Sequence, residues 1–129
     1  RLAAKSDRAA RLALAAIFAN RRRITTEMVQ GLREEARTQR RNQSFRLFLD
    51  GEVRPGGFRT CFLDRLPGMP REVLYIHGRV DPLVRPWHAR RAARLTPGAE
   101  VELMNAGHWP MREMPERFCT HVGAFLARP

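Results

Sequence analysis

Strand-like and helix-like segments alternate over residues 71–127, and this alternation constrains the fold more than any other feature of the sequence. The apolar run VLYI (73–76) is rich in β-branched and aromatic side chains, as in a strand buried on both faces of a sheet. Residues 100–104 alternate glutamate with apolar side chains, as in a strand with one exposed face. A helix is expected after each strand, over 86–95 and from Pro115 onward. In the second of these helices we expect one apolar stripe, formed by Phe118, Val122, Phe125 and Leu126. This order predicts an α/β fold with right-handed crossovers and a parallel sheet.

Each predicted strand leads to a glycine and then to an ionisable residue. The first strand is followed by Gly78 and Asp81. The second is followed by Gly107, which we expect to let the backbone turn sharply, and then by His108. Functional groups in a parallel sheet gather just beyond the carboxyl ends of the strands. Because a carboxylate that accepts the Nδ1 proton of an imidazole fixes its tautomer, Asp81 and His108 are a candidate catalytic acid and base.

The first half of the chain has the pattern of helices. An alanine-rich stretch predicts a helix over 2–19, which Asn20 can close. An amphipathic stretch predicts a second helix over 27–40, with its apolar positions at Met28, Leu32 and Ala36. A shorter amphipathic piece follows and ends near residue 51. Residues 51–70 then contain three prolines and four glycines, which indicates a long connecting segment without regular structure.

The net charge of +11 would in general indicate affinity for nucleic acid or an anionic membrane surface. However, Lys5 is the only lysine, and this one-sided use of arginine suggests a coding bias. The arginine runs at 20–24 and 37–42 have no interleaved aromatic residues for base stacking. No apolar run approaches the length of a membrane span. We therefore expect neither nucleic acid nor membrane as a partner.

Cysteine and histidine spacing gives no metal motif. Cys61 and Cys119 are not in C-x-x-C spacing, and reduced, buried thiols are expected. His77, Asp81 and His108 are the ligand types of a two-histidine, one-carboxylate metal site. The H-x-x-x-D spacing gives that alternative little support, so we expect neither a metal nor an organic cofactor.

Two stretches resemble parts of a known family. VLYIHGRVDPLVRP (73–86) is similar to the strand and turn that carry the catalytic acid in the α/β-hydrolase family. PGAEVELMNAGHWPMREMPERFCTHVGAFL (97–126) is similar to that family's last strand, histidine turn and closing helix. The resemblance implies that residues 67–129 form the C-terminal part of an α/β-hydrolase core. Residues 1–66 would then form a helical lid or cap segment and its connection to the core.

The family's order is nucleophile, acid, base, and the nucleophile is the member of the triad that these residues lack. No G-x-S-x-G elbow occurs, and Ser6 and Ser44 have no flanking glycines. We expect the nucleophile, most often Ser, to come from an N-terminal half of the core outside these 129 residues. By themselves the residues should then be inactive and should associate through the unpaired edge of their first strand.

The resemblance implies hydrolysis of an ester, amide or carbon–carbon bond in a small apolar substrate. His108 would be the general base and Asp81 would orient it; further candidates for substrate contact are Trp109, Phe45, Phe48 and Phe58. An acyltransferase or haloperoxidase of the same fold would share this triad. The alternative is a small basic, non-catalytic binding or interaction protein that retains the hydrolase ending, with nucleic acid as a candidate ligand. A cytoplasmic location is the default expectation.

Overall fold

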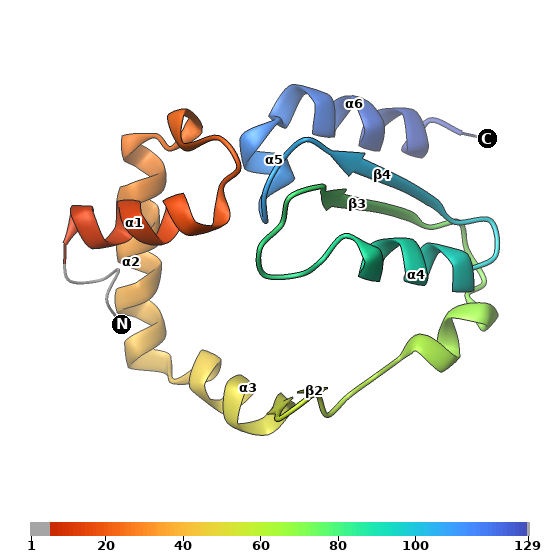
Figure 1. The fold of residues 1–129 in the computed structure, drawn as a ribbon, viewed down its shortest axis with the longest axis horizontal. Helices are drawn as coiled ribbons and strands as arrows, with labels where there is room; N and C mark the ends of the chain where they lie inside the picture. The colour runs from red at the N-terminus through yellow and green to blue at the C-terminus, as the bar shows by residue number, and fades with distance from the viewer. Residues whose placement is uncertain (1–5, 129) are drawn as a thin grey trace.

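The computed structural model describes residues 6–128, apart from the side chains of residues 39–42, 44 and 45 (Figure 1). Helices form the first part of the chain, and a two-stranded parallel sheet with helices on both sides forms the second. An extended connection joins the two parts, and the first helix lies beside the end of the sheet (Figure 1). The loops beyond the strands therefore face the helical part.

The first helix, α1, spans Asp7–Ile17. It begins after Ser6, whose hydroxyl oxygen accepts the Ala9 N–H at 3.2 Å as an N-cap. The start of the helix predicted over 2–19 lies outside the described residues. Its end was predicted too late, because Phe18 already has extended backbone angles.

A 3-10 turn, η1 (Arg21–Arg23), separates α1 from the long helix α2 (Thr26–Asn42). Asn20 does not close α1 as predicted. Its side-chain oxygen instead accepts the Arg22 N–H at 3.0 Å and caps η1. The hydroxyl oxygen of Thr25 accepts a backbone N–H from the first turn of α2 at 3.3 Å, which fixes where α2 begins.

An apolar core lies between α1 and α2, and it holds the helical part of the chain together. Its buried members are Ala10, Leu14, Phe18, Ile24 and Val29. In α2 the most buried of these side chains belongs to Val29, at 2% exposure, whereas the helical stripe in the sequence pointed to its neighbour Met28, which is half-buried. The core face of α2 is thus rotated by about one residue from the face that the sequence pattern favoured.

The connecting segment contains more structure than its composition predicted. α3 (Ser44–Glu52) is followed by a small antiparallel hairpin of β1 (Val53–Arg54) and β2 (Gly57–Phe58), and then by the 3-10 helix η2 (Leu63–Gly68). Pro55 and Gly56 form the hairpin turn, and Gly56 and Gly57, the first residue of β2, both have positive φ. The prediction that 51–70 lacks regular elements was therefore wrong, because the same glycines that break helices also permit a tight hairpin.

The second half of the chain has the predicted order of strand, helix, strand and helix. β3 (Leu74–Gly78) pairs in parallel with β4 (Glu100–Met104), and α4 (Trp87–Leu95) connects them. A short helix α5 (Pro110–Glu113), which the sequence analysis missed, precedes α6 (Pro115–Leu126). Figure 1 shows α4 and α6 on opposite sides of the two strands. The predicted parallel sheet is confirmed.

The burial of the sheet differs from the prediction. Most residues of β3 are half-buried rather than buried on both faces. β4 is the only strand that pairs with β3 among residues 6–128, so the second edge of β3 has no strand beside it in that part of the chain. A strand with one neighbour and one open edge exposes more of its side chains than a central strand does.

Two further expectations about burial were wrong. Cys61 and Cys119 are exposed rather than buried, because the first lies in the connecting segment and the second on the outer face of α6. Leu126 is 73% exposed near the end of α6 and does not belong to an apolar stripe with the half-buried Phe118 and Val122. Within the described range of the chain, no helix is long and apolar enough to cross a membrane.

Candidate active site

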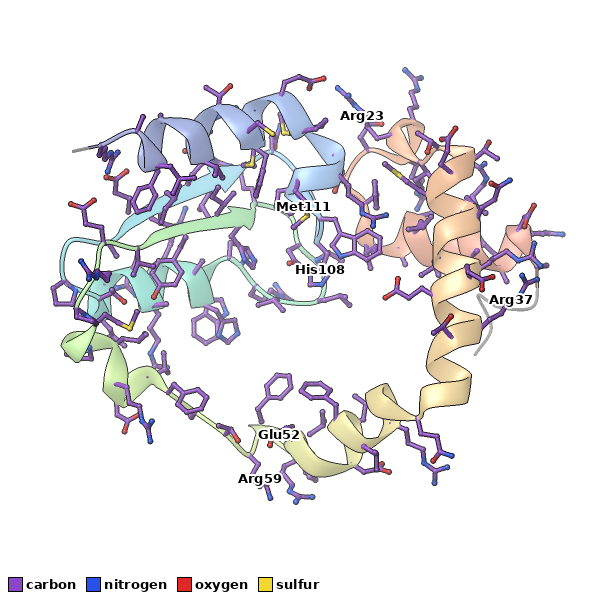
Figure 2. All side chains as sticks on the ribbon, turned by 180° about the vertical axis from the view of Figure 1, so that it is seen from behind. Arg23, Arg37, Glu52, Arg59, His108 and Met111 are labelled. Atoms are coloured by element: carbon purple, nitrogen blue, oxygen red, sulfur yellow. The ribbon has the colours of Figure 1, made fainter. Side chains whose placement is uncertain are left out.

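His108 and Asp81 meet at the carboxyl edge of the sheet. β3 and β4 run in parallel with Gly78 beside Met104, so the loops after the two strands leave the sheet next to each other. His108 Nδ1 lies 2.8 Å from Asp81 Oδ2, which is the distance of a hydrogen bond. Figure 2 shows His108 on the loop between the sheet and the helical part of the chain. The structure thus brings the predicted acid and base together.

Asp81 is 4% exposed, and both of its carboxylate oxygens accept hydrogen bonds. Oδ1 accepts the backbone N–H of Leu83 at 2.8 Å and that of Val84 at 3.0 Å, while Oδ2 faces His108. Burial by itself raises the pKa of the Asp81 carboxyl, but the hydrogen bonds from Val84, His108 and Leu83 together lower it by more. The resulting pKa lies below the ordinary value, so Asp81 is an ionised acceptor at neutral pH.

A second imidazole also lies against Asp81. His77 Nε2 is 2.8 Å from the Val84 carbonyl oxygen and 3.4 Å from Asp81 Oδ2. Because a carbonyl oxygen can only accept, Nε2 of His77 carries the proton and donates it. His77 therefore holds the turn that carries Asp81, a role that the sequence analysis missed because it considered His77 only as a metal ligand. No group of three metal-ligating side chains is arranged around an ion site among residues 6–128.

His108 is held through its backbone as well as its ring. Its N–H donates to the carbonyl oxygen of Ile17 at the end of α1, at 2.8 Å. The side chain is 31% exposed, so the ring is accessible from one side. Since Nδ1 faces Asp81, Nε2 is the nitrogen that can exchange a proton with a nucleophile or substrate.

Gly107 is required for a different reason than the one predicted. Its φ is not in the left-handed region, so no sharp turn demands a glycine there. A Cβ at this position would instead lie 2.1 Å from the carbonyl oxygen of Ile17. Gly78 is similar, because its Cβ would lie 1.8 Å from the Gly107 carbonyl oxygen. Both glycines allow backbones to approach closely around the site.

Glu113 is a buried carboxylate that the sequence analysis did not identify. It is 2% exposed at the end of α5. Oε1 accepts the Gly107 N–H at 2.7 Å, and Oε2 accepts the Asn20 N–H at 3.0 Å. The only signal in the sequence was an acidic residue between two helix-opening prolines, Pro110 and Pro115, which does not by itself indicate burial.

Trp109 is accounted for by packing. Its ring makes an edge-to-face contact with Phe18, with centroids 5.9 Å apart and planes at 84°. The guanidinium of Arg112 lies 4.9 Å from the centroid of the Trp109 ring. Trp109 therefore attaches the loop after β4 to the end of α1, and the structure shows no separate role for it at a substrate site.

The two predicted phenylalanines whose side chains the structure describes do not lie around His108. Phe48 and Phe58 pack against each other, with centroids 6.2 Å apart, and both are exposed. Figure 2 shows Glu52 and Arg59, which flank the hairpin that carries Phe58, far across the molecule from His108. The side chain of Phe45 lies outside the described residues.

An open hollow of about 430 Å³ lies against the turn that carries Asp81. Two arginines and two prolines contribute to its wall, together with one valine and the acid itself: Arg79, Val80, Asp81, Pro82, Arg85 and Pro86. None of the predicted substrate-contact residues with described side chains lines it. The hollow thus lies beside the acid, with the arginine side chains on part of its wall.

A parallel sheet with an acid–imidazole pair just beyond its strand ends is an arrangement typical of enzymes with a nucleophile–histidine–acid triad. Residues 1–121 match the model of the alpha/beta hydrolase family. The chain therefore belongs to the α/β-hydrolase family, and the predicted family resemblance is confirmed. Comparison with curated proteins gives no match.

The solved structures that are similar to this chain include two whose functions are named. One is a meta-cleavage product hydrolase in a mutant form, with a TM-score of 0.71 and 27% identity over 94% of this chain and 45% of that one. The other is an N-acyl homoserine lactone degrading enzyme, with a TM-score of 0.68 and 22% identity over 92% of this chain and 47% of that one. At that identity the second likeness shows the fold alone. The chain spans about half the length of both structures.

Proposed function

We propose that these residues form part of a hydrolase that cleaves an ester, amide or carbon–carbon bond in a small apolar substrate. The observation that carries the proposal is the 2.8 Å contact between His108 Nδ1 and Asp81 Oδ2. Membership of the α/β-hydrolase family and the likeness to a meta-cleavage product hydrolase support hydrolysis as the reaction class. No metal or organic cofactor takes part in the proposed chemistry.

His108 acts as general base and then as general acid. Its Nδ1–H donates to ionised Asp81, which fixes the tautomer and leaves Nε2 free of a proton. Nε2 takes the proton of the nucleophile as the nucleophile attacks the scissile carbonyl, and Asp81 stabilises the imidazolium that forms. His108 then gives the proton to the leaving group.

The nucleophile comes from outside these residues in this proposal. Ser6 is engaged as the N-cap of α1, and no strand-to-helix elbow surrounds it. The open edge of β3 fits a further strand of a hydrolase core, which would place the nucleophile near His108. Residues 67–129 would complete that core, and residues 1–66 would form the helical lid or cap and its connection.

The test is hydrolysis of p-nitrophenyl esters by the full-length protein that contains these residues. His108→Ala should abolish hydrolysis, whereas His121→Ala should leave it unchanged. His121 is a suitable control because it lies on α6, where its Nε2 is 3.5 Å from Glu102. Strong hydrolysis by the 129 residues alone, abolished by His108→Ala, would contradict an external nucleophile. No hydrolysis, combined with salt-dependent binding of RNA, would favour the basic binding protein instead.

A further inference from the structure

We propose that Glu113 is a positioning residue for His108. Its carboxylate joins the histidine loop (105–109) to the segment that follows α1 and thereby sets where the imidazole lies relative to Asp81. This inference rests on the proposed role of His108 as the base. It adds a residue that touches neither substrate nor nucleophile but determines the geometry of the base.

The first observation is that Glu113 is buried and fully engaged. At 2% exposure, a carboxylate without partners would carry a large desolvation penalty. Two backbone N–H groups offset this penalty by donating hydrogen bonds to the carboxylate, that of Gly107 at 2.7 Å and that of Asn20 at 3.0 Å. Among the described residues Glu113 makes no ion pair, so these charge-assisted hydrogen bonds are what the structure provides for it.

The second observation is that these bonds hold the residue directly before His108. Glu113 Oε1 binds the N–H of Gly107, and the next N–H along the chain, that of His108, donates to Ile17 at 2.8 Å. Glu113 Oε2 binds the N–H of Asn20, three residues after Ile17. Three hydrogen bonds therefore join the start of the histidine loop to the end of α1.

The third observation is how closely the two backbones approach. A Cβ on Gly107 would lie 2.1 Å from the Ile17 carbonyl oxygen and 3.0 Å from Glu113 Oε1. The two backbones are already in contact, so the histidine loop cannot move closer to α1. The hydrogen bonds of the Glu113 carboxylate keep the loop from moving away. On the other side, Nδ1 of His108 must stay 2.8 Å from Asp81 Oδ2. Glu113 thus holds the backbone just before His108, while Asp81 holds the imidazole ring.

The decisive variant is Glu113→Gln in the full-length protein. It keeps the size of the side chain but replaces one acceptor oxygen by an amide group, so one of the two backbone N–H groups loses its acceptor. Glu116→Gln is the matched control, because it removes an exposed carboxylate three residues later in the first turn of α6. Glu113→Asp is the second variant: it keeps the charge but shortens the reach.

Three measurements follow from this design. Amide hydrogen exchange should accelerate in Glu113→Gln at Gly107 or at Asn20, whichever N–H loses its acceptor. The NMR resonance of the His108 Nδ1 proton should shift or broaden, because its bond to Asp81 is no longer held in one geometry. In ester hydrolysis kcat should fall by about 10²-fold with KM nearly unchanged, as for a misplacement of about 1 Å of a catalytic group. Glu113→Asp should lie between the wild type and Glu113→Gln, and Glu116→Gln should match the wild type.

The proposal would be overturned if Glu113→Gln accelerated exchange at Gly107 or Asn20 but left the His108 Nδ1 proton and kcat unchanged. Glu113 would then be structural only. If Glu113→Gln does not fold, Glu113→Asp decides by the same two readouts. If the wild-type protein hydrolyses nothing, the proposed function fails. The His108 Nδ1 resonance in the variants still supports or overturns the positioning role, so the two failures are distinguishable.

Discussion

His108 Nδ1 and Asp81 Oδ2 lie 2.8 Å apart although 27 positions separate the two residues in the sequence. The parallel pairing of β3 and β4 makes this contact possible, because it places the loops after both strands at one edge of the sheet. Neighbouring groups then hold the pair, among them the backbone of Val84, the imidazole of His77 and the carboxylate of Glu113.

Acidification should destabilise the protein through Asp81. Its pKa is lower in the folded state than in the unfolded chain, where it is about 3.9. The contribution of Asp81 to the free energy of unfolding is therefore present above the unfolded value and is lost as the pH falls through the folded one. Urea unfolding over a pH series below about 5 should show a steeper loss for the wild type than for Asp81→Asn.

The comparison with Asp81→Asn isolates this residue. Other carboxyls with lowered pKa values, such as Glu100 beside Arg128, titrate in both proteins and cancel in the difference. Parallel stability curves for the wild type and the variant would show that the hydrogen bonds to Asp81 do not lower its pKa.

Alanine at position 107 should be strongly destabilising. Its Cβ would lie 2.1 Å from the Ile17 carbonyl oxygen, so either the histidine loop or the end of α1 must shift. We expect a loss of about 1–3 kcal/mol or more, as for overpacking in a core. Gly123→Ala is the matched control: nothing lies within 4 Å of its added Cβ on α6, and a gain of about 0.5–1 kcal/mol is expected. Equal effects of the two substitutions in urea unfolding would contradict the close contact.

Two leucines of α1 should differ in their contribution to stability. Leu14 is fully buried against α2, and Leu14→Ala should cost about 2–5 kcal/mol. Leu12 is 64% exposed in the same helix, and Leu12→Ala should change the free energy of unfolding by no more than about 0.5 kcal/mol. Thermal or urea unfolding of both variants measures this difference. Similar losses for both would mean that α1 does not pack on α2 as described.

The fold of the second half and the acid–base pair could be predicted from the sequence because both depend on local patterns. Each strand is a short apolar or alternating run with a glycine at or shortly after its end, and topology alone places Asp81 and His108 at one edge. No contact between distant segments had to be known.

Three of the missed features depend on such contacts. Glu113 is buried because it binds Asn20, 93 positions away, and no local pattern reports that. Gly107 was expected to be needed for its backbone freedom. It is needed instead because the backbone of Ile17 approaches it too closely for a side chain. The core position in α2 shifted to Val29 because α1 selects which face of α2 is covered.

The central claim is that Asp81 orients His108 for catalysis, and the kcat of Asp81→Asn in the full-length protein tests it most directly. Asparagine keeps the shape of the side chain but favours the wrong histidine tautomer, so kcat for ester hydrolysis should fall by about 10³- to 10⁴-fold. Asp64→Asn, at an exposed position in η2, should leave kcat unchanged. A near-normal kcat for Asp81→Asn would contradict the claim and remove Asp81 from the triad.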